Sequence, residues 1–376
     1  MKEFVTGNQA VVRGALAAGC NFFAGYPITP ASSILTEFIA AFANGRGTAV
    51  QTEDEIAAIG QCIGAAMSGA KALTASSGPG LSLYSENIGF AQMIEAPLVI
   101  VNCQRMGPAT GGATATGEGD VMFARFVTAG GYPLPVLVAS DGSTAYRCAY
   151  DAFNIAERYR TPVILLISKD ISLTRQSVDL DSVELPPMVD RTLANGNGSF
   201  RPYQINRLDD TPSFAPVGGS RRARVTGSIH DEDGLLTGDR GRIDRKLRHL
   251  VAKIESHRRE WELIDADIDP EATSLVICYG VTDGAARDAI DDMRANRHRV
   301  SRLTICSLWP APVEAIRAAI TPLVQTIVVP ELNIGLYVEE IRRMAGPTPV
   351  VSITRADGGL IEPATIAASM VQRVPA

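Results

Sequence analysis

Residues 72–105 read ALTASSGPGLSLYSENIGFAQMIEAPLVIVNCQR, and this stretch decides the fold class. Its two ends, Ala72–Ser76 and Leu98–Cys103, lack a period of two, which is typical of strands covered on both faces. Between them, Leu81–Met93 is long enough for a helix that crosses over between parallel strands. The stretch therefore predicts a strand, a glycine-rich turn, a helix and a second, parallel strand.

The same alternation continues on both sides of this stretch. Further strands are predicted at Val136–Ala139 and Val163–Ser168. Helices are predicted at Val5–Ala18, Pro30–Phe42, Glu53–Ser68 and Ser143–Arg158, the last with Asp141 as its N-cap. Residues 1–180 are therefore expected to form an α/β domain with a doubly wound parallel sheet.

The pattern changes between residues 181 and 268. Prolines and glycines become frequent, and the alternation of strands and helices stops. This indicates an extended connector over the protein surface, followed by a helix of mixed charge at Ile243–Leu263. Its basic run, Ser220-Arg221-Arg222-Ala223-Arg224, is interpreted as a solvated loop in preference to a nucleic-acid site.

Alternation resumes in residues 269–376. The predicted strands are Leu275–Tyr279, Val300–Leu308, Thr326–Pro330 and Val350–Thr354. The predicted helices are Gly284–Ala295, Val313–Ala319 and Ile334–Met344. This part of the chain predicts a second, smaller α/β domain.

The composition excludes several classes of function. The chain has 376 residues, more than a domain with a single hydrophobic core usually contains, which agrees with two domains. Acidic residues outnumber Lys and Arg by 41 to 35, which argues against binding to nucleic acid or to anionic lipid. No apolar run approaches the ~18 residues that cross a bilayer, and the start of the chain lacks a leader pattern. We therefore expect a cytoplasmic protein without a membrane span.

The cysteines and histidines give no metal pattern. The six cysteines include no Cys-x-x-Cys pair, so buried free thiols are expected and an iron–sulfur cluster on this chain is not. His230, His249, His257 and His298 form no His-x-x-x-His pair. No Gly-x-Ser-x-Gly is present either, which disfavours a serine hydrolase.

The segment Gly25-Tyr26-Pro27-Ile28-Thr29-Pro30 precedes a helical pattern. Thr29 is a favoured N-cap residue and Pro30 fits a first helical position, so backbone N–H groups and a hydroxyl would point at one place. Such a place can bind a carboxylate. From this motif alone, an ordinary helix cap remains the alternative.

The helix predicted at Glu53–Ser68 begins with three carboxylates and continues with Ala, Gly and Ile on nearly every face. Glu55 stands immediately before the apolar part, so its carboxylate is expected to be desolvated and able to bond to a cofactor nitrogen. The alternative is ordinary acidic charge at a helix N-terminus. Gly60 and Gly64 would let another backbone come close.

Two further motifs follow strands. Ser76-Ser77-Gly78-Pro79-Gly80 lacks the residues of a nucleotide loop and predicts a stiff turn where a flat ring can approach the backbone. Arg105 follows the strand Leu98–Cys103 at the edge where ligands of parallel sheets bind, and there it could meet a substrate carboxylate. A surface arginine on a flexible loop is the alternative for Arg105.

These four motifs, with His230-Asp231-Glu232-Asp233-Gly234 and in this order, resemble the alpha subunit of 2-oxoacid:ferredoxin oxidoreductases, most closely the 2-oxoglutarate members. The resemblance covers nearly the whole chain. It implies a pyrimidine-type thiamine-diphosphate domain followed by a domain like the C-terminal domain of transketolase. It also implies that Glu55 is catalytic and holds N1′ of the aminopyrimidine ring.

The resemblance assigns the remaining site residues. Thr29 and Arg105 would hold the C1 carboxylate of the substrate. The cofactor pocket would be lined by Tyr26, Pro27, Ile28, Gly78 and Gly80, next to Glu55.

The resemblance also implies a partner. Thiamine enzymes bind Mg²⁺ and the diphosphate with a Gly-Asp-Gly, which this chain lacks, so Mg²⁺, the diphosphate and a [4Fe–4S] cluster would belong to a beta subunit in an (αβ)₂ assembly. The expected reaction is oxidative decarboxylation of 2-oxoglutarate to succinyl-CoA and CO₂, with coenzyme A as co-substrate and ferredoxin as electron acceptor. The same enzyme could run in reverse.

Departures from the family pattern keep alternatives open. Relatives often carry a basic residue where this chain has Ala115, and their loop differs at Met106 and Ala109. Pyruvate or a branched-chain 2-oxoacid is therefore an alternative substrate. A non-oxidative thiamine-dependent decarboxylase subunit and a non-catalytic scaffold are the alternative functions.

Overall fold

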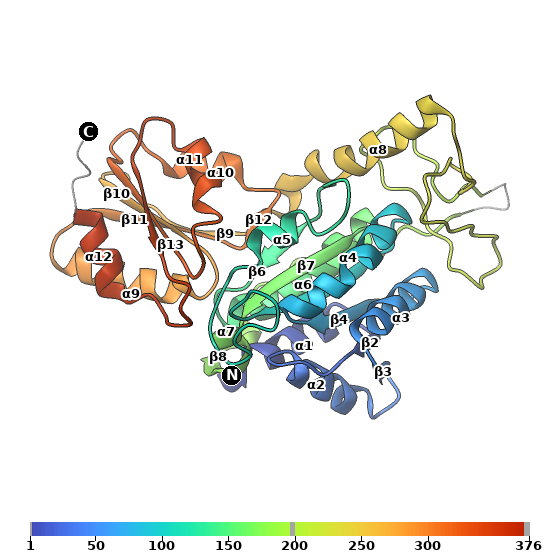
Figure 1. Ribbon diagram of the computed structural model, residues 1–376, viewed down its shortest axis with the longest axis horizontal. Coiled ribbons are helices and arrows are strands. Elements are labelled where there is room, and N and C mark those ends of the chain that lie inside the picture. The colour runs from blue at the N-terminus through green and yellow to red at the C-terminus, as the bar shows by residue number, and fades with distance from the viewer. Residues whose placement is uncertain (1, 196–199, 372–376) are drawn as a thin grey trace.

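The computed structural model describes residues 2–195 and 200–371, which form two large β-sheets with helices on both faces and a small two-stranded sheet (Figure 1). The strands are β1 (Glu3–Thr6), β2 (Phe22–Gly25), β3 (Thr48–Gln51), β4 (Ala72–Ser76), β5 (Leu98–Gln104), β6 (Val136–Val138), β7 (Pro162–Ser168), β8 (Arg175–Val178), β9 (Ile264–Asp267), β10 (Ser274–Cys278), β11 (Val300–Ile305), β12 (Ser307–Trp309), β13 (Thr326–Glu331) and β14 (Val350–Thr354).

The helices are α1 (Gly7–Ala17), α2 (Ser32–Phe42), α3 (Glu55–Met67), α4 (Gly78–Met93), α5 (Val121–Arg125), α6 (Gly142–Tyr159), α7 (Lys169–Leu173), α8 (Arg240–Glu255), α9 (Thr282–Ala295), α10 (Val313–Ala319), α11 (Val338–Met344) and α12 (Pro363–Val371). Two short 3₁₀ turns lie at Leu180–Ser182 and Arg258–Trp261.

The first sheet has the strand order β12-β6-β7-β5-β4-β2-β3. All neighbours are parallel except β12 and β6. Helices α1, α2 and α6 share one apolar core against one face, and α3 and α4 share another. This arrangement confirms the doubly wound α/β fold predicted for the first part of the chain.

The second sheet has the order β14-β13-β10-β11-β9, with β9 antiparallel to β11 and the other pairs parallel. Helices α9 and α12 pack together on this sheet through a separate small core. The predicted second α/β unit is therefore present. Its sheet is parallel except for β9, the antiparallel strand at one edge.

Several predicted elements differ from the structure; the helix expected at Ile334–Met344, for example, begins only at Val338. The strand expected at Val300–Leu308 is interrupted after Ile305, and its second part, β12, leaves the second sheet to pair with β6 in the first. The helix expected to reach Leu263 ends at Glu255, because the chain then turns into a 3₁₀ segment and strand β9. The helix expected at Val5 begins at Gly7, because Thr6 and Gln9 form a capping box there.

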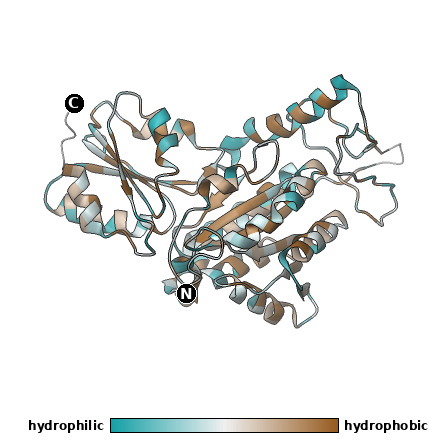
Figure 2. Ribbon diagram, in the orientation of Figure 1, coloured by the Kyte–Doolittle hydropathy of each residue, from teal (hydrophilic) through white to brown (hydrophobic). Residues whose placement is uncertain are grey.

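One large apolar cluster joins the two sheets. It includes Ile59 and Leu81 from helices over the first sheet, and Ile277, Ile305 and Trp309 from the second part of the chain. In Figure 2 the central strands of the first sheet are brown, which marks them as hydrophobic. Because the core is continuous, the segments at the junction of the two sheets are held on both sides.

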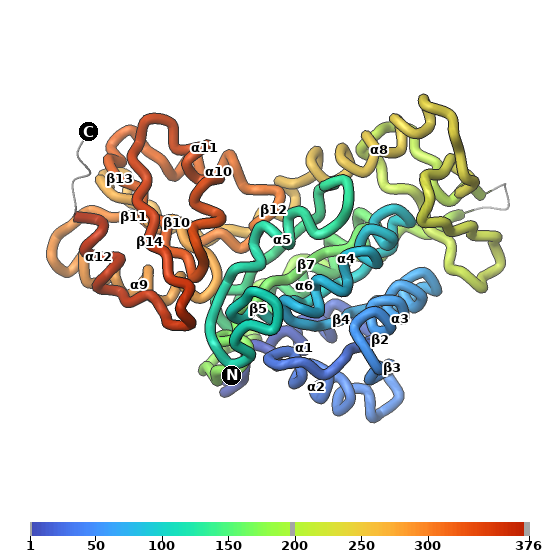
Figure 3. Tube along the Cα trace, viewed as in Figure 1, coloured from blue at the N-terminus to red at the C-terminus, as the bar shows by residue number. Residues whose placement is uncertain are grey.

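The connector after β8 runs as irregular loops at the end of the molecule away from the second sheet, and α8 leads back from it (Figure 3). Its basic run lies on an exposed to half-buried loop, as predicted. Among the described residues, no helix has the length and apolar character needed to cross a bilayer.

Candidate active site

The predicted motifs follow the ends of neighbouring parallel strands. Strand β2 ends at Gly25, β4 ends at Ser76 and β5 ends at Gln104, and these strands belong to one parallel group. The carboxyl ends of parallel strands meet at one edge of a sheet, where ligands bind in open α/β folds. The segments that contain Thr29, Gly78 and Arg105 therefore converge.

Glu55 is the first residue of α3. The helix starts there because Asp54 is its N-cap, with the Asp54 carboxylate accepting the Ala57 N–H at 2.7 Å. The Glu55 side chain is buried, at 7% exposure, as its place before the apolar stretch predicted. Within residues 2–195 and 200–371, no hydrogen bond or ion pair engages its carboxylate. Such a group is ready to accept a bond from a ligand.

Gly80 lets Glu55 and Ser76 lie directly against the backbone at the start of α4. A Cβ at residue 80 would collide with the Ser76 hydroxyl and lie 2.8 Å from Glu55 Oε1. The Ser76 and Ser77 hydroxyls are buried and have no hydrogen-bond partner in the part of the chain that the structure describes. Backbone without a side chain and unpaired polar atoms therefore lie next to the Glu55 carboxylate, and these are groups that a planar ring with polar edges could contact.

Arg105 and Thr29 are in direct contact. Arg105 Nη1 donates to the Thr29 carbonyl oxygen at 2.6 Å, although the two residues are 76 positions apart. The guanidinium is buried, at 7% exposure, and its Nε has no partner among the described residues. One bond fixes the side chain, and the rest of the fork can bind an acidic ligand.

The capping role predicted for Thr29 is wrong. The Thr29–Pro30 peptide is cis, and α2 begins only at Ser32, with Ala31 at the N-cap position. Residues 28–31 instead form a tight turn, in which the Ser32 N–H donates to the Ile28 carbonyl oxygen at 2.9 Å. The N-terminus of α2 therefore lies after this turn. Thr29 contributes its backbone carbonyl to the site, where that carbonyl accepts the hydrogen bond from Arg105.

The neighbouring residues Tyr26, Pro27 and Ile28 lie on the same turn. Tyr26 is 38% exposed, Pro27 is also exposed, and Ile28 is half-buried and packs against the core on the α1 and α2 side. Tyr26 and Pro27 are therefore on the open side of the turn, where a ligand or another chain can reach them.

Three polar residues that the sequence analysis did not single out line the same edge. Asn102 Nδ2 donates to Asp120 Oδ2 at 2.8 Å, and the Asp120 N–H donates to Gln104 Oε1 at 3.2 Å. Asp120 also lies against Gly78, whose Cβ would be 3.3 Å from Asp120 Oδ2. Polar side chains in the otherwise apolar strand β5 were a readable signal for Asn102 and Gln104.

Asp120 is a half-buried acid in this group. Burial raises the pKa of Asp120, against the opposing effects of the Asn102 hydrogen bond and the nearby Arg105 charge. Buried atoms without partners remain around it, namely Asn102 Oδ1, Gln104 Nε2 and Arg105 Nε. Several unpaired polar atoms at one strand edge indicate a ligand site.

Glu118 ties the loop before Asp120 to the second sheet. Its Oε1 accepts the Val281 N–H at 3.0 Å, and its backbone carbonyl accepts Asn333 Nδ2 at 2.9 Å. The side chain is fully buried, and within residues 2–195 and 200–371 its Oε2 has no partner. Burial raises the pKa of Glu118 to about 8, with further increases from Asp170 and Glu331.

Among the described residues, no group of His, Cys, Asp or Glu could hold a metal ion. The six cysteines are free and buried. The polar edge of the first sheet therefore offers contacts to an organic ring and to carboxylates, and the described part of the chain offers no cation site for a diphosphate.

Comparison with known proteins identifies the family. Residues 13–248 match the family model of the thiamine diphosphate-binding domain of pyruvate flavodoxin/ferredoxin oxidoreductase. Residues 272–366 match the family model of pyruvate:ferredoxin oxidoreductase core domain II. The chain belongs to the 2-oxoacid:ferredoxin oxidoreductases, as an alpha subunit.

The relatives of this alpha subunit include two named 2-oxoglutarate synthase subunit KorA. The one from Methanocaldococcus jannaschii is 34% identical over 363 residues, with 95% of each chain covered. The one from Archaeoglobus fulgidus is 38% identical over 342 residues, with 91% of each chain covered.

A solved structure has the same fold. It is the 2-oxoglutarate:ferredoxin oxidoreductase from Magnetococcus marinus with 2-oxoglutarate, coenzyme A and succinyl-CoA bound. The TM-score is 0.91 at 30% identity, over 98% of this alpha subunit, which spans 64% of that longer chain.

The geometry of this alpha subunit fits one half of a thiamine diphosphate. The aminopyrimidine ring needs a carboxylate partner, which Glu55 supplies, and Gly80 places backbone without a side chain beside that carboxylate. The orphaned hydroxyls of Ser76 and Ser77 are available to the ring's polar edge. The diphosphate needs a cation and its ligands, which the described residues do not supply.

Proposed function

We propose that this chain is the alpha subunit of a coenzyme-A-acylating 2-oxoglutarate:ferredoxin oxidoreductase. The reaction converts 2-oxoglutarate and coenzyme A to succinyl-CoA and CO₂ and passes two electrons, one at a time, to ferredoxin. The observation that carries the proposal is the buried, unpartnered carboxylate of Glu55 beside the side-chain-free Gly80. The names of the relatives described above support 2-oxoglutarate as the substrate.

Glu55 acts on the cofactor ring. Bound thiamine diphosphate supplies an electron sink for the loss of CO₂ from a 2-oxoacid. The Glu55 carboxylate would accept a hydrogen bond from N1′ of the aminopyrimidine ring, and it is strong in this role because the site is desolvated. Gly78, Gly80, Tyr26, Pro27 and Ile28 would surround that ring.

Arg105 and Thr29 hold the substrate. The unpaired part of the Arg105 guanidinium would receive the C1 carboxylate, and the bond to the Thr29 carbonyl keeps the fork in place. Asp120 lies between the ring pocket and Arg105, so it would position both through Gly78 and Asn102.

A beta subunit completes the enzyme in this proposal. It would hold Mg²⁺, the diphosphate and the [4Fe–4S] cluster, and two αβ units would form an (αβ)₂ assembly that reduces ferredoxin. Support comes from the absence of a Gly-Asp-Gly in the sequence and of a metal-binding group among the described residues. The six free, buried cysteines fit a reducing compartment, so we propose a cytoplasmic location.

The test replaces Glu55 in the complete complex. Glu55→Gln keeps the shape of the side chain and removes the charge, so we expect kcat for 2-oxoglutarate to fall about 10²–10⁴-fold. Activity is measured with 2-oxoglutarate, pyruvate and branched 2-oxoacids, in the presence of coenzyme A and a viologen dye. Thiamine diphosphate affinity, measured by calorimetry, should fall as well.

The matched control is Glu53→Gln, which changes an exposed acid two residues earlier and should leave both readouts unchanged. Full activity of Glu55→Gln would reject the proposal. Release of an aldehyde without coenzyme A or an electron acceptor would instead identify a non-oxidative decarboxylase. A preference for pyruvate or a branched substrate would correct the substrate alone.

A further inference from the structure

The segment of residues 116–120 is bound to three different elements of the fold. Its sequence alternates Thr116, Glu118 and Asp120 with two glycines. The Thr116 hydroxyl donates to the Asp170 carboxylate at the start of α7. Asp120 Oδ2 accepts a hydrogen bond from Asn102 of β5 at 2.8 Å. Glu118 binds the second sheet, so one short segment joins the candidate active site to both sheets.

This segment supports the backbone that carries Arg105. A Cβ at Gly117 would lie 3.1 Å from the Met106 nitrogen and 3.4 Å from the Arg105 carbonyl carbon. Directly before the segment, the Ala115 carbonyl accepts the Met106 N–H at 3.0 Å. The two stretches of backbone are therefore in van der Waals contact. A shift of the segment must move Arg105 or break these contacts.

Glu118 lies at the edge of the second sheet where ligands bind in open α/β folds. Strands β10 and β13 are parallel neighbours, and Val281 and Asn333 follow their carboxyl ends. Glu118 Oε1 accepts the Val281 N–H at 3.0 Å, and the Glu118 backbone carbonyl accepts Asn333 Nδ2 at 2.9 Å. Val281 is the N-cap residue of α9, so the Glu118 carboxyl binds at the start of that helix.

Glu118 fits closely against the second sheet. Its side chain is fully buried, and its N–H donates to the Leu332 carbonyl at 2.9 Å. A Cβ at Gly280 would collide with Glu118 Oε1 and lie 2.6 Å from Glu118 Cδ. Gly280 also has a φ of +59°, which glycine adopts without strain. Both the main chain and the side chain of Glu118 are therefore fixed by the second sheet.

We infer that Glu118 is a positioning residue for the substrate site, which holds Arg105 in place by fastening residues 116–120 to the second sheet. The inference rests on the proposed function, because that function gives Arg105 the carboxylate of the 2-oxoacid. It adds that groups of the second sheet change the affinity for the substrate without contact with it. Glu118 acts through backbone contacts, so its loss should affect substrate binding more than turnover.

The test compares two replacements of Glu118 in the complete complex. Glu118→Gln keeps an oxygen that can accept the Val281 N–H, so KM for 2-oxoglutarate should stay within about twofold of the wild-type value. Glu118→Leu has a similar size but no acceptor, so KM should rise about tenfold, with a smaller change in kcat. Amide hydrogen exchange in residues 106–120, measured by mass spectrometry, should increase in Glu118→Leu and stay low in Glu118→Gln.

A second variant reaches the same contact from the second sheet. Gly280→Ala places a methyl group where Glu118 Oε1 lies, so it should raise KM and hydrogen exchange as Glu118→Leu does. Combining Glu118→Leu with Arg105→Lys should raise KM by less than the product of the two single effects, because both changes act through Arg105.

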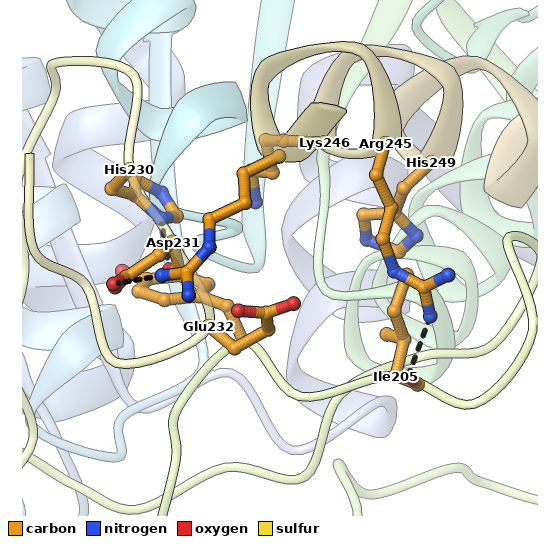
Figure 4. Close-up of a pocket in the computed structure, with 9 residues that line it drawn as sticks. Ile205, His230, Asp231, Glu232, Arg245, Lys246 and His249 are labelled. Atoms are coloured by element: carbon orange, nitrogen blue, oxygen red, sulfur yellow. Dashed lines mark hydrogen bonds and ion pairs between the residues drawn. The ribbon is translucent and has the colours of Figure 1, made fainter. Parts of the chain in front are cut away.

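The matched control breaks a contact at the far end of α4. Figure 4 shows Arg245 of α8, whose Nη2 donates to the Ile205 carbonyl at 2.9 Å. His230 lines the same hollow and contacts the Met93 carbonyl at 3.2 Å. The 16 residues of α4, about 24 Å, separate Met93 from Gly78. Arg245→Leu should therefore leave KM unchanged, whatever its effect on Tm.

The outcomes separate this inference from the proposed function. A wild-type KM in Glu118→Leu, together with a raised KM in Arg105→Lys, would overturn the inference and leave the proposed function standing. An equal rise of KM in Arg245→Leu and Glu118→Leu would show a general loss of stability and would also overturn it. If the wild-type complex turns over no 2-oxoacid, the proposed function fails. Unchanged hydrogen exchange in Glu118→Leu would then still reject the role of Glu118 in holding residues 116–120.

Discussion

At the scale of single residues, Glu118 makes a pH-dependent contribution to stability. Burial raises the pKa of its carboxyl to about 8 in the folded protein, from an ordinary value of 4.5 in the unfolded chain. Between these values the folded state holds a proton that the unfolded state has lost, so stability falls as pH rises from 4.5 to 8. The total loss is on the order of a few kcal/mol.

Glu118→Gln removes this titration. We expect its free energy of unfolding, relative to that of the wild type, to increase steadily from pH 5 to pH 8. Denaturant unfolding at several pH values measures this difference. Glu86→Gln, at an exposed position of α4, is the control and should follow the wild type at every pH. Parallel curves for Glu118→Gln and the wild type would show that Glu118 is ionised throughout.

Arg105 gives a second prediction at this scale. Arg105→Lys keeps the charge but loses the fork that reaches both Thr29 and the substrate carboxylate. We expect KM for the 2-oxoacid to rise about ten- to a hundredfold, because charge-assisted bonds are lost, with a smaller change in kcat. Arg13→Lys, at a surface position, should leave KM unchanged. An unchanged KM in Arg105→Lys would remove this residue from the substrate site.

At the scale of elements, α3 presents an open face. A Cβ at Gly60 or Gly64 would meet nothing within 4 Å, and both residues are exposed. These glycines lie on the same helix as Glu55. In our proposal Glu55 binds the ring of thiamine diphosphate, and the beta subunit binds the diphosphate of the same cofactor. We therefore expect the beta subunit to pack against this open face of α3.

Gly60→Leu tests this face. The leucine fits without a clash inside the chain, so circular dichroism should be unchanged, but the partner subunit should bind more weakly. Sedimentation of the co-expressed subunits measures the loss. Gly284→Leu, at an equally open position on α9, should keep the partner. Equal binding by both variants would place the interface elsewhere.

At the scale of the whole molecule, β12 couples the two sheets. Trp309 belongs to the first sheet, its Nε1 donates to the Val121 carbonyl at 3.0 Å, and its ring packs against Tyr337 at 5.0 Å. The division into residues 1–180, 181–268 and 269–376 stays a prediction. The shared core nevertheless implies that the two sheets unfold together.

Trp309→Ala should therefore destabilise the whole chain. We expect a loss of about 3–5 kcal/mol in a single unfolding transition, because a large buried side chain is removed from the common core. Denaturant unfolding followed by circular dichroism and by fluorescence measures it. Phe4→Ala, at a 64% exposed position, should change little. Two separate transitions in the wild type would contradict this coupling.

Local pattern was sufficient for most of the fold and for part of the site. Strand β4 has the predicted bounds, and β5 extends one residue beyond the prediction. The burial of Glu55 also followed from its neighbours in sequence. Strands β2 and β3 were not predicted, because the four-residue segments FFAG and TAVQ have no run of β-branched residues that would set them apart from their surroundings.

The sequence by itself determined the parallel α/β class, the order of the motifs and the strand ends that present them, because these depend on periodicity and on neighbouring residues. Only the tertiary structure decided that β12 crosses to the first sheet, that Thr29 meets Arg105, and that Glu118 is enclosed by the second sheet. It alone also brought Lys246 and Lys253 to Glu95, more than 150 positions away. Such contacts depend on which surfaces pack together, and no local pattern of residues records that choice.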